Sequence, residues 1–211
     1  SLERPQFFPA QGKRRLRVAL LAGCVQQVIA PEINAATIRL LTRHGCDVAI
    51  SDGSRCCGAL SHHLGKDSLS FARANIDAWE REIAERGLDA IVANASGCGT
   101  TLKDYGHLLA DDPAYADRAA RIAGLCRDIS EVMSDLGLQQ PTRPTGQRVA
   151  YHSACSMQHG QRVIDQPREL LTTAGFDLVE VAEGHLCCGS AGTYNLLQPE
   201  LAGRLRERKA A

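Results

Sequence analysis

The sequence predicts an α/β fold of two homologous β-α-β lobes, each with a parallel sheet and helices on the sheet faces. Two observations predict it. Short apolar runs of strand length alternate with amphipathic segments of helical length, which is the pattern of β-α-β units and their parallel strands. The same order of segments, with its cysteines, occurs twice in the 211 residues and indicates an internal repeat.

The first predicted lobe, residues 15–137, follows an N-terminal arm, residues 1–14, in which we expect no regular element. Its strands are apolar runs that stop at glycine or polar residues, and its helices carry apolar residues three and four positions apart. Proline near the start or glycine after the end bounds most of these helices. The predicted strands are 17–22, 47–51 and 88–95, and the predicted helices are 31–44, 66–86, one from residue 96, and 113–136.

The second predicted lobe, residues 148–211, begins after a polar linker with two prolines, residues 138–147. Its first strand starts with the Arg-Val-Ala of residues 148–150, which repeats the Arg-Val-Ala of residues 17–19. A helix is predicted over residues 199–209. The same elements therefore recur in the same order.

The second lobe is shorter than the first. In the first lobe a third strand and Cys98 follow, 41 positions after Cys57, whereas 23 residues follow Cys188. We therefore expect a truncated second lobe: either the chain is a fragment of a longer protein, or its second lobe does not close its site.

Charge and hydropathy exclude two classes of function. Lys+Arg and Asp+Glu both total 24, so no basic field favours nucleic acid. No apolar run approaches the roughly 20 residues of a membrane span. Nine cysteines occur without a secretory signal in the first residues, which predicts a reducing, cytoplasmic compartment. There, clustered thiols are more often metal ligands or redox groups than structural disulfides.

Seven of the nine cysteines form the repeat. Each lobe has a single cysteine, a spacing of 31 residues and an adjacent pair closed by glycine: Cys24 with Cys56-Cys57, and Cys155 with Cys187-Cys188. Neighbouring Cα atoms lie about 3.8 Å apart, below the roughly 4.4 Å minimum of most disulfides. A disulfide within either pair would therefore be strained.

The loop cysteines are candidate metal ligands. In a parallel sheet the loops that follow the strands meet at the carboxyl edge, where ligand sites lie. Four thiolates are the usual number for an iron-sulfur cluster or a structural zinc. The alternative is that these cysteines pack as small buried hydrophobes. The candidates are Cys24, Cys56, Cys57 and Cys98 (the first thiol set) and Cys155, Cys187 and Cys188 (the second thiol set).

The other two cysteines are assigned to the core. Cys46 corresponds in the repeat to Phe176, an apolar residue that starts a strand, and Cys126 lies in the apolar stripe of a predicted helix. Five histidines lie near the thiols, and each could complete a metal site or hydrogen-bond to a ligand. They are His62, His63, His152, His159 and His185.

Five longer segments resemble the cysteine-rich CCG domain of heterodisulfide reductases and of the iron-sulfur subunits of flavin-linked dehydrogenases. Within that group they are most similar to the iron-sulfur subunits of glycolate oxidases, also called glycolate dehydrogenases. The resemblance covers nearly the whole chain from Arg15 onward. The segments are LLAGCVQQVIAPEINAATIRLL (20–41), CCGALSHHLG (56–65), ANASGCGTTLKDYG (93–106), YHSACSMQHGQ (151–161) and EGHLCCGSAGTYNLLQPE (183–200).

The resemblance implies an iron-sulfur, electron-transport subunit with no catalytic residue of its own. A partner subunit with FAD takes a hydride from the α-carbon of glycolate or another 2-hydroxy acid, a step of glyoxylate metabolism. The iron-sulfur subunit passes the electrons to quinone or another acceptor. The implied location is cytoplasmic, peripheral on the inner face of the membrane through the complex. By motif position, both thiol sets hold clusters.

Two departures from the family pattern limit what the resemblance implies. The fuller pattern ends in CxxC, but its earlier position is Ala95 here, which leaves four thiolates. This argues against a non-cubane cluster with five thiolates and favours a 4Fe-4S cluster with four, zinc being the alternative. The N-terminal ferredoxin-like domain of the family, with its CxxCxxC runs, is also missing from this sequence, which agrees with a fragment.

Two alternative functions remain open on the sequence. One is a structural or interaction module that binds zinc, which has no redox chemistry. The other is a thiol-disulfide reductase of the heterodisulfide type, which the glycolate-oxidase-like segments and the missing fifth thiolate both disfavour.

Overall fold

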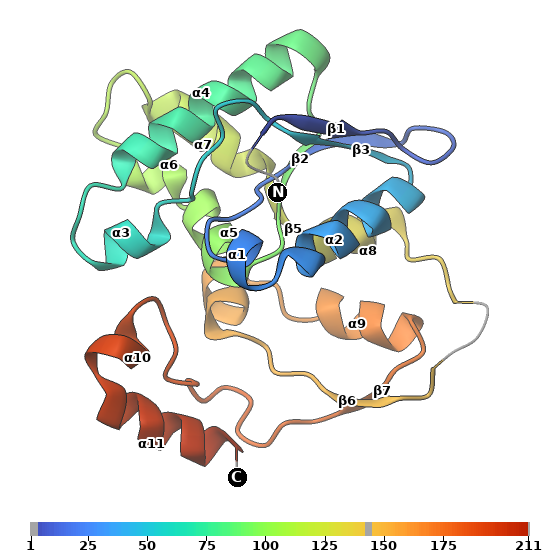
Figure 1. Cartoon of the computed structure of the whole chain (residues 1–211), viewed down its shortest axis with the longest axis vertical. Coiled ribbons are helices and arrows are strands. Elements are labelled where there is room, and N and C mark those ends of the chain that lie inside the picture. Colours follow the sequence, from blue (N-terminus) through green and yellow to red (C-terminus); the bar gives the residue numbers. More distant parts are fainter. Residues whose placement is uncertain (1–3, 142–144, 211) are drawn as a thin grey trace.

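A five-stranded sheet forms the centre of the protein in the computed structural model, which describes residues 4–141 and 145–210 (Figure 1). The strand order is β1-β3-β2-β4-β5, and the last four of these run parallel. β1 pairs antiparallel with β3. The α/β class is confirmed, but the sheet is mixed and not purely parallel as predicted. The strands are β1 (Gln6–Phe8), β2 (Leu16–Leu20), β3 (Cys46–Ile50), β4 (Ala90–Ala93) and β5 (Cys126–Asp128).

β1 lies in the segment predicted as an irregular arm. Its three residues pair with Val48–Ile50 at the edge of β3. The guanidinium carbon of Arg17 lies 5.0 Å from the ring centroid of Phe7, within cation–π distance. The prediction for residues 1–14 is therefore wrong at β1, because three residues carry no periodicity of their own and the pairing depends on β3. Residues 1–3 lie outside the described residues.

Helices cover both faces of the sheet (Figure 1). α2 and α8 pack on one face, and α4 and α7 pack on the other. Alternate residues of β2 point to opposite faces, so Val18 lies in the core beside α2 and Ala19 in the core beside α4. Trp79 of α4 is fully buried in that second core. These helices are α2 (Pro31–Arg43), α4 (Leu69–Arg86), α7 (Ala116–Leu125) and α8 (Ile129–Leu136).

The helix predicted over residues 113–136 is two helices with a strand between them. α7 ends at Leu125, β5 follows and pairs with β4, and α8 begins at Ile129. Apolar spacing continues across the break because both helices and β5 face the core, so spacing alone did not show it. Cys126 in β5 and Cys46 in β3 are buried, which confirms their assignment to the core.

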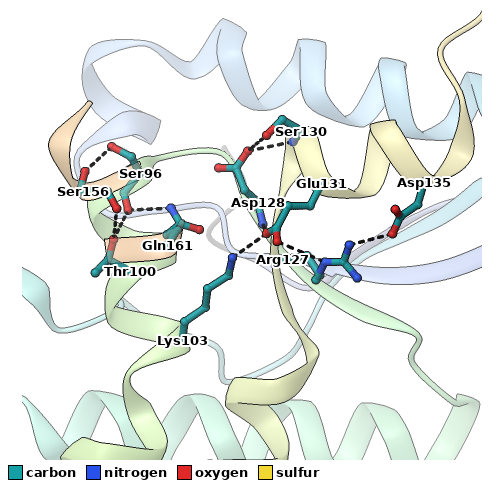
Figure 2. Close-up of polar contacts among 10 residues, drawn as sticks. All are labelled: Ser96, Thr100, Lys103, Arg127, Asp128, Ser130, Glu131, Asp135, Ser156 and Gln161. Carbon is teal, nitrogen blue, oxygen red and sulfur yellow. Dashed lines mark hydrogen bonds and ion pairs between the residues drawn. The ribbon is translucent and has the colours of Figure 1, made fainter. Parts of the chain in front are cut away.

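Asp128 ends β5 and caps α8. Its carboxylate accepts hydrogen bonds from the backbone nitrogen of Ser130 at 2.8 Å and from the Ser130 hydroxyl at 2.6 Å (Figure 2). The carboxylate of Glu131 in turn accepts from the backbone nitrogen of Asp128 at 2.7 Å, which completes a capping box. Lys103 donates to Glu131 at 2.6 Å. Burial raises the pKa of Asp128, so this cap carries a partly desolvated carboxyl.

We expect Asp128→Ala to lower the free energy of unfolding by about 1–2 kcal/mol, because it removes the cap and leaves a buried N–H without its acceptor. Asp128→Asn keeps an acceptor and removes the desolvated charge, so it should cost less. Urea unfolding at pH 7 measures both variants. Unchanged stability of the alanine variant would contradict the capping role.

The chain after residue 145 contains a two-stranded parallel sheet in which β6 pairs with β7. The strand predicted to start at residue 148 is β6, and the helix predicted over 199–209 is α11. The boundaries of the two lobes stay predictions, and residues 142–144 of the predicted linker lie outside the described residues. The elements are β6 (Arg148–Ala150), the π-helix η1 (Ser156–Gln161), α9 (Gln166–Thr173), β7 (Asp177–Val179), α10 (Tyr194–Leu197) and α11 (Pro199–Ala210).

Of the helices that the structure describes, none combines the length and the apolar character needed to cross a membrane.

Candidate metal centre

The first thiol set lies in three loops at the carboxyl edge of the sheet. The loops follow β3, β2 and β4, which are neighbours in the sheet and run parallel, so their ends meet. Cys24 lies between β2 and α1 (Gln26–Ile29), and Cys56 and Cys57 lie between β3 and α3 (Ala59–His63). Cys98 is in the first turn of α5 (Ser96–Lys103). The topology therefore brings together four cysteines that are up to 74 positions apart in the sequence.

The four thiols form a row of contacts. The Sγ atoms of Cys24 and Cys56 are 3.2 Å apart, and those of Cys57 and Cys98 are 3.4 Å apart. Cys56 also interacts with Cys57 through its side chain. Cys57 is buried, with 3% of its surface exposed, whereas Cys24 is exposed. The row thus runs from the protein interior to the surface.

The same four residues line one cavity of about 350 Å³. Most of its other walls are apolar, including Val25, Ile29 and Leu60. Ala95 also lines it, so a methyl group stands where the fuller family pattern has a thiol. Val25, Ile29 and Leu60 are themselves exposed, so the cavity is open to water on their side, and only its inner wall shields what the thiols hold.

The thiol contacts and burial shift the pKa values of this set. Burial, followed by the contact with Cys56, raises the pKa of Cys24, and the contact with Cys57, followed by burial, raises that of Cys56. The contact with Cys56 lowers the pKa of Cys57, but the contact with Cys98 and burial outweigh it and raise that pKa to about 12. The contact with Cys57 lowers the pKa of Cys98 despite burial. Three of the four thiols therefore hold their protons more tightly than an ordinary cysteine until a cation compensates the negative charge, and Cys98 is the exception.

The donor chemistry of this row fits a thiolate-bound metal or cluster. Four soft sulfur donors open on one cavity, which is the ligand number of a structural zinc or a 4Fe-4S cluster. Bonds of about 2.3 Å at tetrahedral angles set sulfur atoms about 3.8 Å apart, so these protonated thiols are packed more closely than zinc ligands. Accordingly, within residues 4–141 and 145–210 no three Cys, His, Asp or Glu side chains are already arranged as ligands of one ion. Binding requires the sulfurs to move apart.

Gly58 turns the chain after the first cysteine pair. Its φ is +89°, and a Cβ at this position would lie 3.1 Å from the backbone oxygen of Ser68, just before α4. Gly189 repeats both features, with φ +77° and a would-be Cβ 2.8 Å from the backbone oxygen of Ala202 in α11. The glycine of each CCG triplet is therefore required by its left-handed backbone and by the helix packed against it.

We expect Gly58→Ala to lower the free energy of unfolding by about 2 kcal/mol or more, because it adds a steric contact to an unfavourable φ. Gly65→Ala is the matched control. Gly65 has φ +66° but no atom within 4 Å of a would-be Cβ, so that variant should lose only about 1 kcal/mol. Urea unfolding compares the two, and equal losses would show that the contact with Ser68 is unimportant.

Polar side chains that the sequence patterns did not single out support the cavity. Gln26 donates hydrogen bonds from Nε2 to Oδ1 of Asn34 at 2.7 Å and to Oδ1 of Asn94 at 2.8 Å. Asn34 donates to the backbone oxygen of Ala22 at 2.7 Å, just before the Cys24 loop. All three amides lie in segments that resemble the family, at 20–41 and 93–106, but no spacing marked them as functional. Asn75 and Tyr105, behind the cysteine pair, were missed because no local pattern distinguishes them from other residues of their helices.

The second thiol set repeats the local turn but not the row of contacts. The backbone nitrogen of Gly189 donates to Sγ of Cys187 at 3.3 Å, as that of Gly58 donates to Sγ of Cys56 at 3.4 Å. Cys155 precedes η1, and Cys187 is exposed. In the part of the chain that the structure describes, no contact joins two thiols of this set.

One histidine lies at the first cavity. His63 lines it, and a Cβ built on Gly192 would lie 3.0 Å from the His63 ring, so the loop after the second cysteine pair closes on this cavity. Among the described residues, none of the five candidate histidines hydrogen-bonds to a thiol.

α5, which carries Cys98, packs against η1, which follows Cys155, and Figure 2 shows the polar contacts between them. The hydroxyl of Ser156 donates to that of Ser96 at 2.8 Å, and Thr100 donates to the backbone oxygen of Ser156 at 2.9 Å. The amide of Gln161 donates to the backbone oxygen of Ser96 at 3.0 Å and lies directly on Gly99. This crossing joins the helix that carries Cys98 to the helix that follows the single cysteine of the second set.

Comparison with known proteins agrees with this geometry. The family model of the CCG cysteine-rich domain matches residues 18–103 and again residues 149–211, which supports the internal repeat. The chain is 41% identical to the glycolate oxidase iron-sulfur subunit of Escherichia coli (strain K12), over 95% of this chain and 49% of that protein. It is 36% identical to a probable glycolate oxidase iron-sulfur subunit of Bacillus subtilis (strain 168), over 99% of this chain and 47% of that protein.

A more distant similarity is to one subunit of the fumarate reductase (CoM/CoB) of Methanothermobacter marburgensis, at 31% identity over 92% of this chain and 37% of that protein. The chain thus spans about half the length, or less, of these relatives. The family match covers more than half of the chain and both cysteine repeats, so the chain belongs to the CCG cysteine-rich domain family.

Proposed function

We propose that this chain is an iron-sulfur electron-transfer subunit of a flavin-linked 2-hydroxy-acid oxidase or dehydrogenase that acts on glycolate. A partner subunit with FAD would supply the electrons, and quinone or another acceptor would receive them. The similarity to two glycolate oxidase iron-sulfur subunits supports the partner and the substrate. The first thiol set is the proposed holder of a 4Fe-4S cluster in this chain. The second thiol set, with three thiols, would hold another centre only where a further ligand completes it.

The observation that carries this proposal is the row of four thiols in one cavity. A 4Fe-4S cluster would supply one-electron storage there. Cys57 and Cys98 anchor the inner end of the row, while exposed Cys24 brings its outer end to the surface. The buried apolar residues of its inner wall, Leu21 and Ala93, restrict water there, which would tune the potential of a bound centre. An electron carrier needs a site that is shielded on one side and open on the other.

Anaerobic reconstitution with iron and sulfide tests the proposal. We expect bound iron and sulfide in roughly four-to-four ratio, visible absorbance that dithionite bleaches, and an EPR signal in one oxidation state. A colourless protein with stoichiometric zinc and no reducible absorbance would instead support a structural zinc module. The four-thiol donor set is compatible with that second candidate as well.

A third candidate, a thiol-disulfide reductase of the heterodisulfide type, draws support from the similarity to the fumarate reductase (CoM/CoB) of Methanothermobacter marburgensis. It predicts turnover of a disulfide by this chain without a flavin partner. Absence of such turnover in a reconstituted, redox-active preparation would favour the electron-transfer proposal.

A further inference from the structure

We infer that Asn75 and Tyr105 are positioning residues that hold the backbone of the cysteine pair Cys56-Cys57 in the conformation that aims both thiols at the cavity. The link from this role to electron transfer rests on the proposed function. The role itself rests on a hydrogen-bond network behind the pair, on its burial, and on its absence from the second pair.

The network reaches both cysteines through their carbonyl groups. Asn75 donates from Nδ2 to the backbone oxygen of Cys56 at 3.0 Å, and Tyr105 donates from Oη to the backbone oxygen of Cys57 at 3.0 Å. The two side chains are joined, since Nδ2 of Asn75 also donates to Oη of Tyr105 at 2.9 Å. The backbone nitrogen of Arg55, just before the pair, donates to Oδ1 of Asn75 at 2.6 Å. Two side chains thus hold three consecutive residues.

Burial raises the free-energy cost of losing these hydrogen bonds. Asn75 and Tyr105 are both 0% exposed, and Tyr105 belongs to the apolar cluster that also contains Trp79 and Ile91. In such surroundings a carbonyl that loses its donor has no water to replace it, so the loss favours local opening of the loop. Phenylalanine at position 105 would fill the same space without the donor. The hydrogen bonds of the network, and not only the packing of its side chains, therefore fix the conformation of the loop.

The second pair has no equivalent buried network. The residues that pack on Gly58 and on Gly189 are 134 positions apart, so the position that corresponds to Asn75 is Lys209 on α11, which is only half-buried. The loop before the second pair is held instead by Lys209, whose ammonium donates to the backbone oxygens of Glu183, Gly184 and Leu186 at 2.8, 3.1 and 3.1 Å. That clamp ends one residue before Cys187 and lies near the surface. Buried positioning is thus specific to the first thiol set.

Alkylation of the metal-free, reduced full chain tests the positioning role without any cluster. In Tyr105→Phe we expect Cys57 to react with iodoacetamide about tenfold faster than in the parent, because the freed loop opens more often. Cys46 is an internal reference for global unfolding, since it is fully buried in the core on the opposite face of the sheet. Its rate should change far less than that of Cys57. Mass spectrometry of peptides gives both rates.

Tyr115→Phe is the matched control. It removes a hydroxyl that donates to the carboxylate of Asp77 at 3.0 Å, away from the thiols, so the ratio of Cys57 to Cys46 rates should stay at the parent value. Asn75→Leu is the second test variant, of similar size and without the amide, should Tyr105→Phe fold poorly. If neither test variant raises the ratio above that of Tyr115→Phe, the positioning role is refuted.

The iron-loaded protein links the role to function. In the iron-loaded protein we expect Tyr105→Phe to shift the EPR signal and the midpoint potential of the centre. We also expect it to release iron to a chelator about tenfold faster, because loss of outer-shell partners weakens metal sites by about this much. Tyr115→Phe should leave all three unchanged. If the parent binds no iron, the proposed function fails, but the alkylation ratio still decides the positioning role. If the alkylation ratio rises but the EPR signal, the midpoint potential and the rate of iron release do not change, the positioning role is confined to the metal-free loop.

Discussion

Replacing Cys57 with serine will abolish binding of the iron-sulfur centre by the first thiol set. Cys57 is the most deeply buried member of that set and contacts Cys98, so it anchors the inner end of the row. Serine keeps the volume but is a far weaker ligand for iron than a thiolate. We expect the affinity to fall by more than the roughly 10–100-fold that loss of an outer-shell partner causes. Iron analysis and EPR after anaerobic reconstitution measure the loss.

The matched control for this substitution is Cys46→Ser. Cys46 is also a buried cysteine, but it lies in β3 in the core beside α2 and contacts no thiol of the first set. It should lower stability and leave the iron content per folded molecule unchanged. Full iron binding by the Cys57→Ser protein, with an unchanged EPR signal, would contradict the assignment of the first thiol set.

The second large effect is that iron in the reconstituted protein protects one thiol set from alkylation and not the other. We expect iron to protect Cys24, Cys56, Cys57 and Cys98 from alkylation, while Cys155, Cys187 and Cys188 stay reactive. The first set offers four thiols in a row of contacts around one cavity. The second offers three thiols, with no thiol–thiol contact among the described residues, and Cys187 is exposed. Ligand number and the gathering of four thiols on one cavity therefore both favour the first set.

Peptide mass spectrometry after pulsed alkylation, with and without iron, measures this protection. The double variant Cys155→Ser/Cys187→Ser is the control, and its iron content and EPR signal should equal those of the parent. Protection of the second set alone would reverse the assignment, and equal protection of both sets would show that each holds a centre in this chain.

Much of the strand and helix order follows from the sequence because it depends on local periodicity. β2, β3 and β4 are largely apolar runs, and each predicted end differs from the observed one by one or two residues. The repeat of a single cysteine and a CCG triplet also lies in the sequence. Because parallel strands place their following loops at one edge, this order was enough to predict that the first thiol set gathers.

Other features depend on contacts that no local pattern records. β1 exists because the edge of β3 offers a partner, and the break between α7 and α8 exists because β5 pairs with β4 and Asp128 caps the next helix. Apolar spacing alone predicts one continuous helix there, because residues on both sides of the break face the core.

The support of the thiols was decided by the tertiary structure alone. Asn75 lies 19 positions from Cys56, and Tyr105 lies 48 positions from Cys57, and neither spacing has a periodic signature. The sequence by itself determined which thiols are available and at which edge of the sheet they lie. Only the folded chain decided which of them touch and which buried donors hold them, because those bonds form between side chains and carbonyls brought together from separate elements.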